Sequence, residues 1–244
     1  SNHVFQDGSI VYGKGIVETS EDFGSQGSQP THRELLDWLS AWFIENNWDA
    51  KSLCRLITTS QTYRKDSIPT QEMIDEDPEN KWLARGPKQR LMAEMIRDQA
   101  LSAAGILSPT LGGPSVKPYQ PAGVWKEVSG ATYQPDKGEG LHRRSLYTFW
   151  KRTAPPPSML TFDATSREDC ISRRVPTNTP LQALVLLNDP QFIEAARMLA
   201  QRMALEGGES VTDQIKYGFQ LVLTREPRMR ELDVLNTLYL ERLD

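Results

Sequence analysis

Nine prolines and no helical periodicity mark the stretch between residues 107 and 178, and helical patterns flank it on both sides. A segment of this length without regular structure is uncommon inside a compact domain, and it is usually functional or wrapped over the core. Runs of alternating apolar and polar residues, the pattern of a half-buried strand, are scarce in the chain. The sequence therefore predicts a mainly α fold, in which packed helical pairs lie on either side of a long proline-rich irregular insert at about 107–178.

The first helix before the insert has a clear start signal. Thr31 and Glu34 match a capping box, and apolar residues at helical spacing follow them, which predicts a helix over about 32–46. Asp49 is placed to cap the N-terminus of a second helix. Because the connection between these two helices is short, we expect them to form an antiparallel pair.

Two further helices are predicted before the insert begins. Asp77 is followed by a proline, the usual order at a helix start, and is expected to begin a short helix near Trp82. Apolar residues then recur at intervals of three and four over about 88–104. Gly105 stands where a C-terminal cap belongs, so the sequence predicts that this helix ends there.

Helical signals return after the insert. Thr179 and Gln182 form a second capping box, with a proline between them at the first helical position. The Asn-Asp-Pro run at 188–190 is expected to cap the next helix, and Ser210 the one after it. A last helix is predicted over about 228–242.

The domain organisation follows from glycine content and length. Residues 1–30 are rich in glycine and serine, which predicts an N-terminal arm or a truncated start. The lack of an internal repeat and the remaining length favour a single helical domain over 31–244. The last predicted helix ends without glycine or proline, so we expect the domain to be truncated at one or both ends.

The overall charge argues against a nonspecific nucleic-acid binder. Lys and Arg number 28 against 32 Asp and Glu, and the net charge of −4 provides no general basic field. No uncharged apolar run reaches the length of about 18 residues that a membrane helix needs. Residues 1–30 also lack the basic-then-apolar order of a signal peptide. The sequence predicts no nucleic-acid partner and no membrane insertion by this segment.

The two cysteines, Cys54 and Cys170, form no C-x-x-C motif, and the histidines are too scattered to suggest a metal triad. We therefore expect no metal and no cofactor bound by this segment. One disulfide is compatible with the count, but two free thiols are favoured. Cys54 adjoins apolar residues on a predicted helix face, where a buried, inert thiol is the commoner outcome.

The strongest chemical signal is an excess of positive charge in the second half of the insert. Residues 141–178 hold seven Arg and Lys against three Asp and Glu. Arginine suits the bidentate capture of carboxylate, sulfate or phosphate, and neighbouring aromatic rings could supply a stacking face. The alternative, which we favour, is that the arginines act as internal staples on the carbonyls of an irregular segment. The candidate ligand-binding residues are Arg143, Arg144, Tyr147, Trp150, Lys151, Arg152, Asp163, Arg167 and Glu168.

Catalysis has weaker support in the sequence. Asp163 or Glu168 would handle the proton if the insert hydrolysed an anionic polysaccharide. His142 adjoins the arginines, but a lone histidine is more often structural than a general base. No nucleophile elbow, H-E-x-x-H motif or P-loop occurs. No catalytic residue is assigned, and whether the chain is an enzyme stays open.

A family resemblance rests on six segments spread over nearly the whole chain. Together they resemble the planctomycete-specific, cytochrome-associated C-terminal domain of unknown function. This chain departs from the family pattern at its N-terminus, where extra residues precede Gly13, and at His142, where an aromatic residue often stands. The segments are Thr19 to Trp38, Asp77-Pro-Glu-Asn80, Gly112-Gly-Pro-Ser115, Tyr133-Gln-Pro-Asp-Lys-Gly138, Arg143 to Pro157 and Thr177 to Pro190.

The resemblance implies a context rather than an activity. Domains of that family are similar to the last module of large exported bacterial proteins that also carry a haem-c type cytochrome module. It therefore implies an extracytoplasmic location, periplasm or cell surface, and haem c in another domain of the parent protein.

Three hypotheses about function follow. The leading one is a non-catalytic helical module that docks against neighbouring domains of the same polypeptide or binds a surface polysaccharide. The alternative is a carbohydrate-active enzyme, or half of its site, acting on a sulfated or uronic polysaccharide. The third is a pure scaffold whose loops are only packed.

Overall fold

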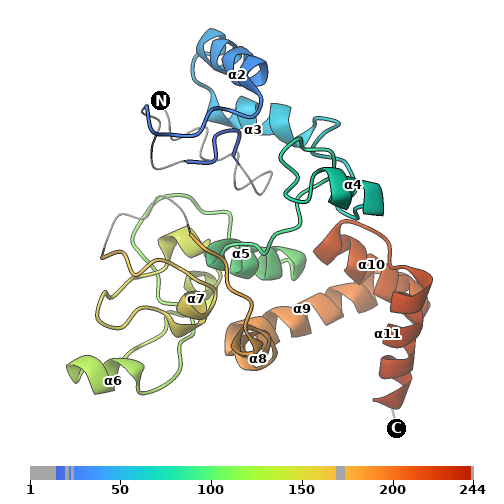
Figure 1. Cartoon of the computed structure of the whole chain (residues 1–244). Helices are drawn as coiled ribbons and strands as arrows, with labels where there is room; N and C mark the ends of the chain where they lie inside the picture. The colour runs from blue at the N-terminus through green and yellow to red at the C-terminus, as the bar shows by residue number, and fades with distance from the viewer. Residues whose placement is uncertain (1–14, 20–21, 23–24, 169–173, 243–244) are drawn as a thin grey trace. The chain divides into compact units, whose positions relative to one another are not determined.

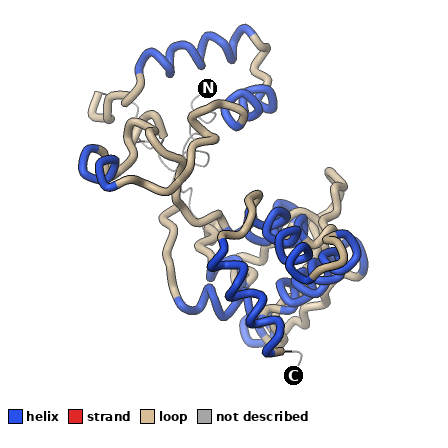
Figure 2. The backbone as a smooth tube through the Cα atoms, turned by 90° about the vertical axis from the view of Figure 1, so that its right-hand side faces the viewer, coloured by secondary structure: helices blue, strands red, loops and turns tan. Residues whose placement is uncertain are grey.

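The computed structural model describes residues 15–19, 22, 25–168 and 174–242, and within them the chain is helical and irregular (Figure 1). Ten α-helices and two short 3-10 helices lie in these ranges, and no strand does (Figure 2). The only β-type pairings among the described residues are two isolated bridges, Ser108 with Arg143 and Val116 with Thr148. The prediction of a mainly α fold is confirmed.

The Cα positions cluster into two compact units, Ser1–Arg90 and Leu91–Asp244, called here the N-terminal and the C-terminal unit. Each is described by itself. The single domain expected over 31–244 stays a prediction. The described helices of the N-terminal unit are α2 (Arg33–Glu45), α3 (Ala50–Thr58) and α4 (Gln71–Glu76).

A small apolar core holds α2 and α3 together. Leu39 and Phe43 of α2 are buried against Leu53 of α3. The chain reverses between the two helices through Asn47 and Trp48, which have φ angles of 55° and 60°. The Trp48 ring then meets the edge of Phe43, with ring centroids 5.2 Å apart. The reversal thus places a half-exposed aromatic ring against Phe43 at the margin of this core.

The two helix starts turn out differently. Asp49 caps α3 as predicted, since its carboxylate accepts the backbone N–H groups of Lys51 and Ser52 at 2.9 and 3.2 Å. The prediction of a capping box at Thr31 is wrong. His32 is the N-cap of α2 and makes no side-chain cap bond. The Thr31 hydroxyl instead donates to the carbonyl of Ile16 at 3.2 Å, so a tertiary bond has replaced the local one.

Two other expectations in the N-terminal unit are wrong. No helix begins at Asp77, because Asp77 follows the end of α4 and the chain continues in turns past Trp82. Helix α4 itself was not foreseen. Cys54 carries a free thiol that is exposed rather than buried, because Leu53 beside it takes the core-facing position on α3. Cys170 lies outside the described residues.

Helix α9 is the centre of the C-terminal unit and packs against three other helices, α5, α8 and α10 (Figure 1). Helix α11 packs on α10, and α7 packs on both α5 and α8. The long helices are α5 (Ala93–Ala103), α8 (Pro180–Asn188), α9 (Pro190–Glu206), α10 (Val211–Leu223) and α11 (Met229–Glu241). The insert adds α6 (Val124–Ser129), α7 (Pro157–Thr161) and the 3-10 helices η1 (Gly138–Leu141) and η2 (Ser145–Tyr147).

The core of this unit joins the insert to the long helices. Met159 and Phe162, from α7 and the residue after it, are buried against Ala93 of α5 and Phe192 of α9. The rings of Phe162 and Phe192 meet edge to face, with centroids 6.4 Å apart. The proline-rich segment is therefore partly wrapped over the core, as its length suggested.

Most local start and stop signals in this unit are confirmed. Asp189 caps α9 by accepting the N–H of Gln191 at 2.9 Å, and Ser210 caps α10 by accepting that of Asp213 at 3.1 Å. Gly105 has a φ of 75° directly after α5, the conformation that glycine adopts at helix ends. Helix α5 begins at Ala93, five residues later than the start expected at 88.

Candidate functional site

Arg143 is a buried staple of the insert. Its guanidinium donates to the carbonyl oxygens of Pro114 at 2.9 Å and Thr110 at 3.3 Å, and also to that of Gly112. The same guanidinium stacks on the ring of Tyr147, 4.0 Å from its centroid. The guanidinium donors of Arg143 are thus bonded to carbonyl oxygens of the chain itself, and they are not directed at an anion. For this residue the geometry matches the favoured interpretation from sequence.

Tyr147 takes part in the same arrangement. Its hydroxyl oxygen accepts the backbone N–H of Gly112 at 2.7 Å, and its carbonyl accepts that of Val116 at 2.8 Å. The Phe149 N–H then donates to the carbonyl of Val116 at 2.7 Å. Tyr147 is therefore a support for the glycine-containing loop rather than an open stacking face.

A second set of predicted residues lies around Trp150 and Asp163. The Trp150 indole N–H donates to the carbonyl of Ser166 at 3.0 Å, and the exposed Arg167 covers its ring at 4.7 Å. The carboxylate of Asp163 accepts the N–H and the hydroxyl of Thr177 at 2.7 and 2.9 Å. Both arrangements order the irregular chain that leads toward α8.

Lys151 lies on a further aromatic ring, that of Trp125, which in turn contacts the ring of Phe149. The Lys151 ammonium lies 4.5 Å from the centroid of the Trp125 ring, and Lys117 lies 5.7 Å from the same ring. Arg144, Arg152 and Glu168 are exposed. The role of the nine candidates in ligand binding stays a prediction.

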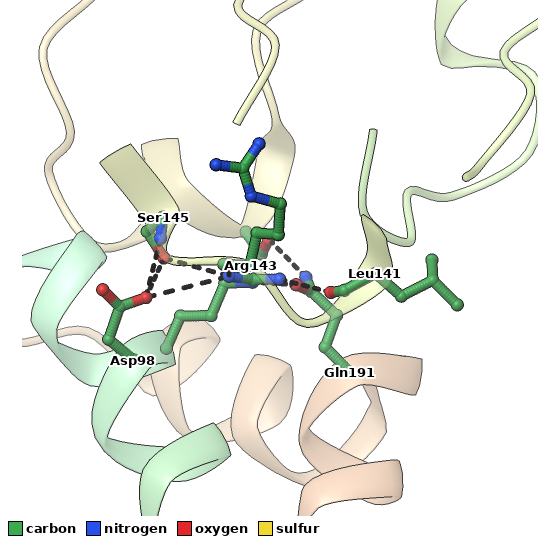
Figure 3. Close-up of polar contacts among 7 residues, drawn as sticks. Asp98, Leu141, Arg143, Ser145 and Gln191 are labelled. Atoms are coloured by element: carbon green, nitrogen blue, oxygen red, sulfur yellow. Dashed lines mark hydrogen bonds and ion pairs between the residues drawn. The ribbon is translucent and has the colours of Figure 1, made fainter. Parts of the chain in front are cut away.

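Sequence analysis missed the most buried charged group in the described chain, Arg97 of α5, which is 3% exposed. Its guanidinium donates to Gln191 Oε1 at 2.6 Å, to the Leu141 carbonyl at 2.6 Å and to the Arg143 carbonyl at 2.8 Å (Figure 3). These acceptors come from α9, from η1 and from Arg143, two residues before η2 begins. The Arg97 side chain therefore fixes the insert to α5 and α9.

Asp98 completes this network. Its Oδ1 atom accepts the N–H and the hydroxyl of Ser145 at 2.8 and 2.7 Å and lies 3.8 Å from Nη1 of Arg97 (Figure 3). Burial lowers the pKa of Arg97, and the Asp98 charge opposes that shift. The guanidinium remains charged, because an arginine in a protein does not lose its proton.

An aspartate beside a serine hydroxyl resembles an activated nucleophile, but Ser145 is 1% exposed. A nucleophile has to reach its substrate, so this pair cannot attack one in the described conformation. We conclude that Arg97, Asp98 and Ser145 form a structural brace. The sequence did hold a signal for it, since Ala93, Arg97 and Leu101 share one helix face and all three are buried.

Two side-chain contacts, one of them an ion pair, attach the insert to the long helices. His142 Nε2 lies 3.2 Å from Glu194 of α9, so this histidine faces a helix partner. Arg174 makes a two-pronged contact with Glu94 of α5 at 2.7 and 3.0 Å. Burial raises the pKa of Glu94, but the Arg174 hydrogen bond and charge, with a backbone bond, lower it below its ordinary value. That contribution to stability is present above the unfolded-state pKa of Glu94 and is lost as the pH falls through the folded-state value.

The surface of α8 is unusual for a helix at the edge of a described unit. Its sequence, Pro180 to Asn188, contains no charged residue, and only Gln182 is fully buried. Leu181, Leu184 and Leu187 are 56%, 54% and 71% exposed. Their spacing places them on one side of the helix, called here the leucine face. A helix that is apolar all round is normally buried, so this face is the clearest candidate contact surface.

A family model named PSD1, and described as a protein of unknown function (DUF1553), matches residues 2–239. The chain belongs to this family. No curated protein and no solved structure matches it. Membership of PSD1 therefore supplies a family without an activity, and the function has to be argued from the surfaces described above.

Two general features of this PSD1 chain bear on that argument. None of the helices in the described ranges is long and apolar enough to cross a membrane. The described His, Cys, Asp and Glu side chains form no group of three that could hold a metal ion.

Proposed function

We propose that this chain is a non-catalytic docking module of a larger extracytoplasmic protein. Its leucine face on α8 would bind another domain of the same polypeptide. The observation that carries the proposal is an uncharged helix whose three leucines remain more than half exposed. Full burial of an exposed leucine side chain contributes about 1.5–3 kcal/mol, and covering the half or more of each of these three that is still exposed gives a corresponding share of that gain.

The nature of the partner follows from the chemistry of the face. Leu181, Leu184 and Leu187 offer no charge and no hydrogen-bonding side chain, so the complementary surface has to be apolar. A small face is sufficient when its partner is joined by a linker, because the linker supplies an effective concentration in the millimolar range.

The family resemblance suggests which domain this is. It implies a parent protein that is exported and carries haem c in a separate cytochrome module. We therefore propose that module as the partner and assign no cofactor to the present segment. The planctomycete origin and the cytochrome association are parts of the same proposal.

The contacts of the insert support docking over the enzyme alternative. Arg143 uses its guanidinium on carbonyls, and Asp163 uses its carboxylate on Thr177. A side chain that already makes these hydrogen bonds contributes less to binding sulfate or to transferring a proton. Arg144 and Arg152 are both exposed, and they provide the test of the alternative.

The docking test uses a variant in which Leu184 and Leu187 are both changed to glutamate. Calorimetric titration against the separately produced cytochrome module should show affinity weakened by about tenfold or more, because two carboxylates would be desolvated in the contact. The matched control is Leu205→Glu on α9, where the native leucine is 77% exposed and outside the leucine face.

The outcomes separate the hypotheses. Unchanged helicity with lost binding supports docking, while equal affinities for the variant and the control, or no binding by the native chain, contradict it. A rise in the melting temperature with sulfated oligosaccharides, abolished by changing Arg144 and Arg152 to serine, would favour the polysaccharide alternative instead.

A further inference from the structure

Helix α8 has the reverse of the usual orientation of a surface helix. Its one fully buried side chain is that of Gln182, which is 4% exposed, whereas Leu184 and Leu187 are 54% and 71% exposed. Because successive residues of an α-helix are turned by about 100°, Leu184 and Leu187 lie about 160° and 140° from Gln182 around the helix axis. The glutamine therefore lies on the side opposite the leucine face.

The burial of apolar surface does not explain this orientation. All residues from Ala183 to Leu187 are apolar, so the pattern alone allows either side of α8 to face the core of the C-terminal unit. The side that holds Leu184 and Leu187 is the more apolar one, and turning it inward would place the Gln182 amide in water, where it needs no protein partner. The observed orientation thus requires a compensating interaction on the Gln182 side.

The hydrogen bonds of the Gln182 amide provide this compensation. Its Nε2 group donates to the carbonyl oxygens of Thr161 at 3.0 Å and Thr177 at 3.3 Å, and to the Thr177 hydroxyl at 3.1 Å. Its Oε1 atom accepts the backbone N–H of Thr179 at 3.3 Å. Both ends of the buried amide are therefore bonded, and the bonds hold only while α8 directs Gln182 inward.

The partners of Gln182 are held in place from outside α8. The Thr177 hydroxyl donates to Oδ1 of Asp163 at 2.9 Å, and the Thr177 N–H donates to Oδ2 at 2.7 Å. Since a hydroxyl has one proton, its lone pairs are left for the Gln182 amide. Thr161 is the last residue of α7, and Asp163 follows it by two positions. The acceptors thus form a fixed receptor for one glutamine side chain.

We propose that Gln182 is a positioning residue, which holds α8 with the leucine face outward and so keeps that face competent for docking. The use of the face rests on the proposed function, but its orientation does not. A single buried polar residue can select one packing of an apolar helix over another, as asparagine does in coiled-coil cores. Without the Gln182 hydrogen bonds, α8 turns its leucines toward the core and the docking face is lost.

A second role of Gln182 has to be separated from this one. With Thr179 it forms the capping box of α8, and glutamate serves in such boxes as well as glutamine does. A carboxylate at this position keeps the acceptor for the Thr179 N–H but cannot donate to Thr161 or Thr177. Gln182→Glu therefore preserves the cap and removes the bonds that set the orientation.

The test is the rate of maleimide labelling of Leu187→Cys in this chain alone, with the two native cysteines changed to serine. Gln182→Glu should slow labelling by about threefold, the factor for roughly two-thirds of molecules with the face turned inward, because the carboxylate turns toward water. Gln182→Met removes the hydrogen bonds without burying a charge, and should slow labelling by about twofold. The control is Leu205→Cys on α9, where the native leucine is 77% exposed and the rate should not change.

Circular dichroism of each variant establishes that the helices persist. Slower labelling at position 187 in both variants supports the proposal. It is overturned if Gln182→Met labels as fast as the native glutamine or faster, or if Gln182→Glu leaves the rate unchanged, the result expected of a helix cap alone. No partner is present, so these outcomes are separate from those of the docking test. Slower labelling in both variants, together with no binding of the cytochrome module by the native chain, would contradict the proposed function alone.

Discussion

Replacing Arg97 with alanine destabilises the C-terminal unit by about 3–5 kcal/mol, the expected cost of breaking a buried charged network by removing one partner. The guanidinium leaves behind the carbonyls of Leu141 and Arg143 and the side chain of Gln191, all hydrogen-bonded to it in the native structure. Domains of this size have a free energy of unfolding of about 5–15 kcal/mol, so the loss is a large part of the total.

Hydrogen exchange of the α5 amides in increasing urea measures this loss in the unit concerned. Arg97→Lys should recover only part of it, because an ammonium cannot match the fork geometry of three separate acceptors. Arg144→Ala removes an exposed arginine one residue from the network and should change stability by no more than about 0.5 kcal/mol. Equal free energies of unfolding for Arg97→Ala and Arg144→Ala in this experiment would show that Arg97 is not a structural brace.

Asp98→Ala is expected to cost about 2–3 kcal/mol. The buried N–H and hydroxyl of Ser145 lose the same acceptor, and an unsatisfied buried donor carries its full desolvation penalty. Asp98→Asn keeps an oxygen at that position and removes only the charge beside Arg97. It should therefore cost clearly less than the alanine variant.

The two residues should also be coupled. In a double-mutant cycle, Arg97→Ala with Asp98→Ala should cost less than the sum of the single changes, by about 1 kcal/mol, because both residues support the chain at Ser145. The exchange experiment above supplies all four free energies. If the two losses of stability simply add, Arg97 and Asp98 act separately and do not form one brace.

Helix ends were predictable where the signal is local. Asp189, Ser210 and Gly105 act on backbone within a few residues, and each behaves as its type suggests. The prediction of a helix start was wrong where the same side chain makes a different hydrogen bond. Asp77 accepts two backbone N–H groups as an N-cap would, but in a turn rather than a helix. Thr31 bonds to a carbonyl fifteen residues away, a contact that no local pattern reveals.

The candidate site was predictable in part. The arginine excess of the insert was visible in the sequence, and the staple interpretation fits Arg143. Arg97 was not found, because a charged residue is ordinarily counted against the buried face of a helix. The helix at Leu184 was expected, but an uncharged helix has no polar side to indicate which leucines stay exposed. That information exists only in the packing.

The most direct test of the docking account is the reactivity of a cysteine placed at Leu187, in a chain whose two native cysteines are changed to serine. The rate of maleimide labelling is compared between this chain alone and the parent polypeptide that contains it. If the leucine face is docked, labelling is about tenfold slower in the parent, the factor for roughly nine-tenths of molecules being docked, and the rate for a cysteine at Leu205 is unchanged. Equal rates at Leu187 in the two proteins would contradict the docking account.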